Sequence, residues 1–128
     1  MRASILIIAA ALGLAGAAQA DTPPLGKPAP SCFRSMDWSG WHAPDRNTIY
    51  LRVRMKDVYR LDLASGSSLL TWPTSHLINN VRGTDSVCGP IDLDLKVAED
   101  GFVEPLFIKS ITKLTPEQVA AIPKKDLP

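Results

Sequence analysis

The stretch from Ile49 to Leu63, read IYLRVRMKDVYRLDL, constrains the fold more than any other part of the chain. Successive side chains of a strand point to opposite faces of its sheet. One face of the two arms carries Ile49, Leu51, Val53, Met55, Tyr59, Leu61 and Leu63. The opposite face carries Tyr50, Arg52, Arg54, Val58, Arg60 and Asp62. Alternation this regular predicts an antiparallel hairpin with one buried face and one solvated face.

The two apolar rows must face the same core, so the loop between the arms holds an odd number of residues. Two registers with three-residue loops satisfy this condition: one pairs Val53 with Leu61, and the other pairs Val53 with Tyr59. We favour the first, because it sets Arg52 opposite Asp62. Neither loop contains glycine, so Asp57 or Lys56 is expected to adopt a left-handed conformation.

The first 20 residues have the pattern of a secretory signal peptide. Arg2 precedes an apolar run, and Ala18-Gln19-Ala20 is a small-x-small cleavage site. The alternative is a membrane anchor, but the run is short and ends in a cleavage site. We therefore expect cleavage after Ala20, a periplasmic or secreted product, and no stable membrane insertion after signal removal.

The expected mature chain has three parts. Residues 21–31 form a proline-rich leader, residues 32–123 a single β-rich domain, and residues 124–128 a polar tail. Removing the signal takes away Arg2, one of 14 basic residues, which leaves a balance with the 13 acidic residues. A net charge near zero argues against a nucleic-acid partner.

Cys32 and Cys88 are the two cysteines of the chain. In an oxidising compartment such a pair predicts a disulfide. The alternative is a reactive thiol or a metal-binding pair, but the sequence has no CxxC motif and no histidine near either cysteine.

Other segments complete a mainly β fold. A strand is expected over residues 91–97, followed by a turn with Asp100-Gly101 at its tip. Residues 103–114 are expected to return as a strand, buried on both faces or bulged near Lys109-Ser110, with Pro105 near an edge. Residues 74–81 fit either one helical turn or an irregular connection.

A short helix is predicted near the C-terminus, because Thr115, Pro116 and Gln118 form a capping box with proline at the first position. The expected architecture is a small antiparallel sheet or partial barrel of about five strands with this helix. An oligonucleotide-binding-like topology is one option.

Several segments together resemble a family of small exported bacterial proteins, domain-of-unknown-function family 6491. They read Cys32-Phe33, WSGW, TIYLRV, VYRLDLA, HLINNVRGTDSVC, PIDLDLKV and IKSITKLTPEQVAAIP. The resemblance covers residues 32–123 and implies an exported Gram-negative protein of uncharacterised role. It also implies that relatives often carry a further cysteine pair, at the positions of Ser67-Ser68 and near Leu106-Phe107, which this chain lacks.

Two small sets of residues could in principle carry chemistry. Asp92 and Asp94 share one face of a strand, but the solvated side of a sheet explains them as well. His42 and His76 lack the spacing of a metal site or a catalytic motif. We therefore expect no catalytic residue, no metal and no cofactor.

Aromatic and basic residues are the candidates for recognition. The aromatic residues have two alternative roles: they could form a binding platform at the surface, or they could complete the apolar core. These residues are Trp38, Trp41, Trp72, Tyr50 and Tyr59. The candidate binding surface is the outer face of the hairpin, with Tyr50, Arg52, Arg54 and Arg60.

These features predict a non-enzymatic module that binds an envelope protein or polymer. The alternatives are a small periplasmic hydrolase, or an inhibitor or accessory of a partner protein.

Overall fold

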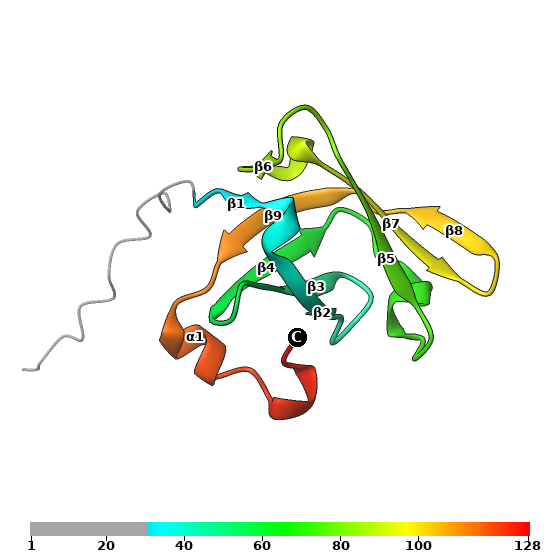
Figure 1. The fold of residues 1–128 in the computed structure, drawn as a ribbon. Coiled ribbons are helices and arrows are strands. Elements are labelled where there is room, and N and C mark those ends of the chain that lie inside the picture. The colour runs from blue at the N-terminus through cyan, green and yellow to red at the C-terminus, as the bar shows by residue number, and fades with distance from the viewer. Residues whose placement is uncertain (1–30) are drawn as a thin grey trace, which may run out of the picture.

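The computed structural model describes residues 31–128, in which the chain forms nine strands, one α-helix and four short 3₁₀ helices (Figure 1). The mainly β class and the C-terminal helix are confirmed. Within the described part the strands form three antiparallel sheets and no closed barrel. The expected signal peptide and residues 21–30 of the leader lie outside the described residues.

The largest sheet has four strands in the order β2-β3-β4-β9. Their bounds are β2 (Trp38–His42), β3 (Thr48–Val53), β4 (Asp57–Leu63) and β9 (Ile108–Lys113). β3 and β4 are the two arms of the predicted hairpin. Lys109 stands as the extra residue where the ladder passes from the Asp62–Ser110 pair to the Leu63–Ile108 pair, which confirms the expected bulge.

The hairpin has a three-residue loop, as parity requires, but both expected registers are wrong. Val53 pairs with Asp57, and the loop is residues 54–56. Arg54, and not the expected Asp57 or Lys56, adopts the left-handed conformation with φ 58°. Its backbone N–H donates to Asp37 O at 2.7 Å. This tertiary contact stabilises the observed turn, whereas our preference rested on a cross-strand charge pair. Met55, expected in the apolar row, lies in the loop and is 84% exposed.

The second sheet has three strands in the order β5-β7-β8. They are β5 (His76–Val81), β7 (Leu93–Glu99) and β8 (Phe102–Pro105). The two expectations for residues 74–81 are wrong, because β5 pairs with β7 along its whole length. Asp100 and Gly101 form the two-residue turn between β7 and β8 with positive φ, as predicted.

Two predicted strands have different bounds in the structure. The strand expected over 91–97 begins only at Leu93, because Pro90–Asp92 forms the 3₁₀ helix η3. The strand expected over 103–114 is divided between β8 and β9, which belong to different sheets. The sequence alternation could not show where the chain leaves one sheet for another.

One apolar core joins the two larger sheets. The expected inner row of the hairpin is buried except for Met55, and Val58, expected on the solvated face, is buried as well. The inward-facing residues of β7 pack in the same cluster. The main members are Phe33, Ile49, Leu51, Val53, Tyr59, Leu61, Leu63, Leu70, Val87, Leu93, Leu95, Val97 and Leu106. The rings of Phe33 and Tyr59 lie 4.7 Å apart between centroids. Tyr59 therefore belongs to the core, not to a surface platform.

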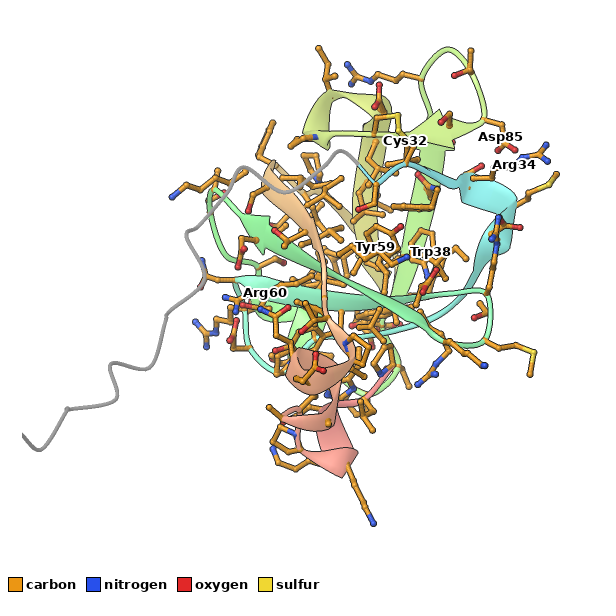
Figure 2. All side chains as sticks on the ribbon, turned by 90° about the vertical axis from the view of Figure 1, so that its left-hand side faces the viewer. Cys32, Arg34, Trp38, Tyr59, Arg60 and Asp85 are labelled. Carbon is orange, nitrogen blue, oxygen red and sulfur yellow. A yellow bond between two sulfur atoms is a disulfide. The ribbon has the colours of Figure 1, made fainter. Side chains whose placement is uncertain are left out.

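A third, two-stranded sheet pairs β1 (Phe33–Arg34) with β6 (Ser86–Val87). Cys32 and Cys88 flank this pair and form a disulfide, with their Cα atoms 4.2 Å apart. Figure 2 shows Arg34 beside Asp85, and its Nε donates to Asp85 Oδ2 at 3.2 Å. Ser35 Oγ also donates to the Asp85 carboxylate, and this hydrogen bond lowers the pKa of Asp85. The segment that follows the leader is therefore held against residues 85–88 by a disulfide and by side-chain contacts with Asp85.

The C-terminal helix α1 (Pro116–Ala120) has the predicted capping box. Gln118 N donates to Thr115 Oγ1 at 3.2 Å, and Thr115 N donates to Gln118 Oε1 at 2.8 Å. These bonds satisfy backbone donors that the first turn of a helix leaves free.

Replacing both Cys32 and Cys88 with serine should lower the free energy of unfolding by about 2–4 kcal/mol, because the bridge closes a loop with a sequence separation of 56 residues. Urea denaturation of the mature protein and the double variant measures this. Two free thiols in denatured, unreduced wild-type protein would contradict the bridge.

A second prediction concerns alkaline pH. Burial raises the pKa of Tyr59 above its usual value of 10.0, because burial disfavours the phenolate. Its contribution to stability is fully present below pH 10 and is lost as the pH rises through the folded-state pKa. The stability difference between wild type and Tyr59→Phe should therefore shift in favour of the variant above pH 10. Urea denaturation of both proteins from pH 8 to pH 11 measures this. A constant difference between their urea midpoints over this range would contradict the prediction.

Candidate functional site

The arginines of the predicted binding surface are engaged within the protein. Arg60 donates from Nη2 to Asp62 Oδ1 at 2.8 Å, and Arg54 Nε donates to Asp37 Oδ2 at 3.1 Å. Tyr50 lies opposite Arg60 in the ladder and is only partly exposed. The positive charge of this surface is therefore partly offset by carboxylates of the same chain.

Arg52 makes the contact with the largest structural consequence. Its Nε donates to the Pro128 backbone carbonyl at 2.7 Å. The residues expected to form a polar tail thus return to the hairpin, where the C-terminus lies beside β2 (Figure 1). Lys124–Asp126 forms the 3₁₀ helix η4, and Asp126 is buried. The outer face that we expected to be solvated is covered in part by the chain's own end.

The carboxylate of Asp126 also contacts the side chain of a histidine. Its Oδ1 lies 3.3 Å from His42 Nε2 on β2. His76, at the start of β5, is exposed. Among residues 31–128, no group of three or more His, Cys, Asp or Glu side chains could hold a metal ion.

The two aspartates considered for chemistry have separate structural partners. Asp92 Oδ2 accepts from the backbone N–H groups of Cys88 and Gly89, at 2.8 and 2.9 Å. Asp94 Oδ1 lies 3.8 Å from Arg82 Nη2. Asp92 therefore stabilises the turn into η3 instead of sharing a strand face with Asp94.

The tryptophans form the most distinctive feature of the surface. All three in the chain line two neighbouring pockets, of about 520 and 450 Å³. The first pocket is lined by Trp41, His42, Ala43, Pro44, Leu70, Thr71, Trp72, Pro73 and Ser75. The second is lined by Ser35, Met36, Trp38, Ser39, Gly40, Trp41, Leu77 and Asn79. Trp41 lines both, so we call the pair the tryptophan groove.

The tryptophan groove lies where two sheet edges face each other. One wall comes from β2, the edge of the four-stranded sheet, and Figure 2 shows Trp38 in this region. The other wall includes β5, the edge of the three-stranded sheet, and the segment before it. Leu77 and Asn79 are two residues apart on β5, so their side chains point to the same side of that wall, and Ser75 directly precedes the strand.

The groove walls carry no carboxylate, ammonium or guanidinium group, and His42 is their single titratable side chain. Four hydroxyl groups of the walls donate their hydrogens to other parts of the chain. The acceptors are Asp85 Oδ1 for Ser35, Arg54 O for Ser39, Ser68 O for Thr71 and Leu69 O for Ser75. Because each hydroxyl hydrogen is used, these oxygens present lone pairs to a ligand. The walls therefore favour a neutral ligand that donates hydrogen bonds.

Asn79 is a further polar group of the groove. Its Oδ1 is buried, and it has no hydrogen-bond partner among the described residues. An unsatisfied buried acceptor costs about 1–3 kcal/mol. Sequence reasoning missed Asn79, Ser75 and Leu77 because residues 74–81 gave no clear strand pattern. The tryptophans were identified, but their convergence depends on how the two sheets meet.

Comparisons with known proteins place the chain in one family. The model of a family of unknown function (DUF6491) matches residues 1–126. Neither a curated protein nor a solved structure matches the chain. In residues 31–128, no helix is both long enough and apolar enough to cross a membrane.

Replacing Asp126 with alanine should lower the free energy of unfolding by about 1–2 kcal/mol, because His42 loses a partly buried partner. The control is Arg60→Gln, which removes a more exposed ion pair and should cost less than about 1 kcal/mol. Urea denaturation measures both variants. Equal and small effects would show that the C-terminal contact does not stabilise the fold.

Proposed function

This chain belongs to the family of unknown function DUF6491, and we propose that it is an exported, non-enzymatic module that binds a neutral, hydroxyl-rich polymer of the cell envelope in the tryptophan groove. The observation that carries this proposal is the convergence of all three tryptophans on one uncharged groove. The basic face of the hairpin supports recognition less well, because its arginines already have partners within the chain.

The chemistry of the groove favours a carbohydrate. Binding pockets combine apolar or aromatic walls with a few well-placed polar groups. Indole rings offer large flat faces to the C–H faces of a sugar ring, while the hydroxyl oxygens of Ser39, Thr71 and Ser75 can accept from sugar hydroxyls. An anionic ligand would find no fixed positive charge on the walls.

Export is supported by two features. Residues 1–20 have the signal-peptide pattern, and the Cys32–Cys88 disulfide is of the kind that persists in an oxidising compartment. We therefore propose that the protein works in the periplasm or outside the cell.

A hydrolase is the second candidate, and the His42–Asp126 contact favours it. Asp126 could orient His42 as a general base at the first pocket. The nearby hydroxyl of Ser75 does not complete a triad, because it donates to Leu69 O. A nucleophile hydrogen-bonded to its base is the arrangement that such catalysis requires.

An inhibitor or accessory of a partner protein is the third candidate. The β7–β8 hairpin projects from the body of the domain (Figure 1), and Phe102 near its tip is 70% exposed. A projecting hairpin with an exposed aromatic ring could contact another protein.

The binding proposal is tested by titrating the mature protein with soluble neutral oligosaccharides while tryptophan fluorescence and calorimetric heat are recorded. Trp72→Ala should weaken binding about tenfold or more, because Trp72 is exposed on the groove wall. Phe107→Ala is the matched control, since Phe107 is an exposed aromatic residue outside the groove.

Absence of binding across the oligosaccharide panel would overturn the proposed function. Release of new reducing ends during incubation would instead support the hydrolase, and loss of that release in His42→Ala would assign it to the groove.

A further inference from the structure

We infer that the tryptophan groove contains two subsites on either side of Trp41, and that it binds a chain of linked sugars in which the unit at Asn79 carries an acetamido group. This inference rests on the proposed function and names the substrate class of the same groove.

The two-subsite arrangement follows from the shared wall. Trp41 lines both pockets, while Trp72 lines only the first and Trp38 only the second. Each pocket has a volume within the range of small-ligand sites. A ligand confined to one pocket could contact only two of the three indole rings, whereas a chain passing Trp41 could contact all three.

The second subsite has a fixed aromatic wall. Trp38 Nε1 donates to Gly40 O at 2.8 Å, and this bond holds the indole in place. Because the N–H is used, Trp38 offers a ring face and no donor. The polar recognition in this subsite must come from other side chains, of which Asn79 is the largest.

Asn79 has unused hydrogen-bonding capacity. Its Oδ1 lacks a partner and is buried, and no hydrogen bond from its Nδ2 is found among the described residues. Rotation about χ2 of an asparagine is soft, so the amide can turn its oxygen toward the pocket when a donor arrives. An acetamido group matches this side chain in either orientation of the amide, because its N–H can donate to Oδ1 in one orientation and its C=O can accept from Nδ2 in the other.

The test compares two series of β-1,4-linked oligosaccharides of one to four units, N-acetylglucosamine oligomers and glucose oligomers, by isothermal titration calorimetry. We expect affinity to rise about tenfold or more between one unit and the longer chains. We also expect the acetylated series to bind about 3–10-fold more tightly at equal length, the factor that one net hydrogen bond supplies.

Variants assign these effects to the subsites. Asn79→Leu should remove the preference for the acetylated series and leave the dependence on Trp72 intact. The matched control is Asn80→Leu, because Asn80 is the next residue of β5, is exposed, and points to the opposite side of the strand. Asn79→Ala, which removes the side-chain amide without adding bulk, replaces Asn79→Leu if the latter lowers the urea midpoint.

The outcomes separate this inference from the proposed function. Single sugars that bind as tightly as tetramers, with loss in Trp72→Ala, would overturn the two-subsite inference and leave the proposed function standing. Equal affinity of the two series in wild type would overturn the acetamido assignment. Absence of binding by either series, while other neutral sugars bind through Trp72, would also overturn the inference. Absence of binding by all neutral sugars would overturn both proposals.

Discussion

The structure depends on one shared core between two sheets. The inner row of the β3–β4 hairpin packs in the same apolar cluster as the inward-facing residues Leu93, Leu95 and Val97 of β7. Strands twist, so sheets that pack closely at their centres diverge toward their edges. The edges β2 and β5 face the resulting gap, and the tryptophan groove lies between them. The burial that stabilises the fold thus also creates the groove in which we propose that a ligand binds.

The outer face of the hairpin shows how a chain can use a charged surface for its own structure. Arg52 holds the C-terminal carbonyl of Pro128, and Arg54 holds Asp37 before β2. Both contacts position segments next to the groove, since Gly40 beside Pro128 and Ser39 beside Arg54 line its second pocket. The arginines therefore contribute to recognition, if the groove binds as proposed, by placing its walls and not by contacting the ligand.

The groove is uncharged but not apolar, and this combination restricts the class of ligand that would fit its walls. Serine and threonine hydroxyls commonly serve as both donors and acceptors, but those of the groove have their hydrogens engaged within the chain. A ligand of the kind that we propose would then supply the donors. His42 is the exception on the walls, and its contact with Asp126 links the groove to the C-terminus. A change at the end of the chain can therefore reach the groove through one side chain.

Sequence alone determined the elements whose signals are local. Period-two alternation identified the hairpin faces, the Asp100-Gly101 turn follows from glycine's freedom at positive φ, and the Thr115–Gln118 capping box marks the helix start. The family was also recognisable from the sequence. These features depend on neighbours within a few residues, or on side-chain alternation along a single strand.

Tertiary structure decided what depends on distant partners. The hairpin register followed the Arg54–Asp37 contact, and β5 formed because β7 offered a complete ladder. The groove required Trp41 and Asn79, far apart in sequence, to meet between two sheet edges. The alternation of side chains along a strand specifies which face of the strand is buried. It does not specify which other strand covers that side, because the energy of that choice comes from contacts between segments that the sequence does not place together.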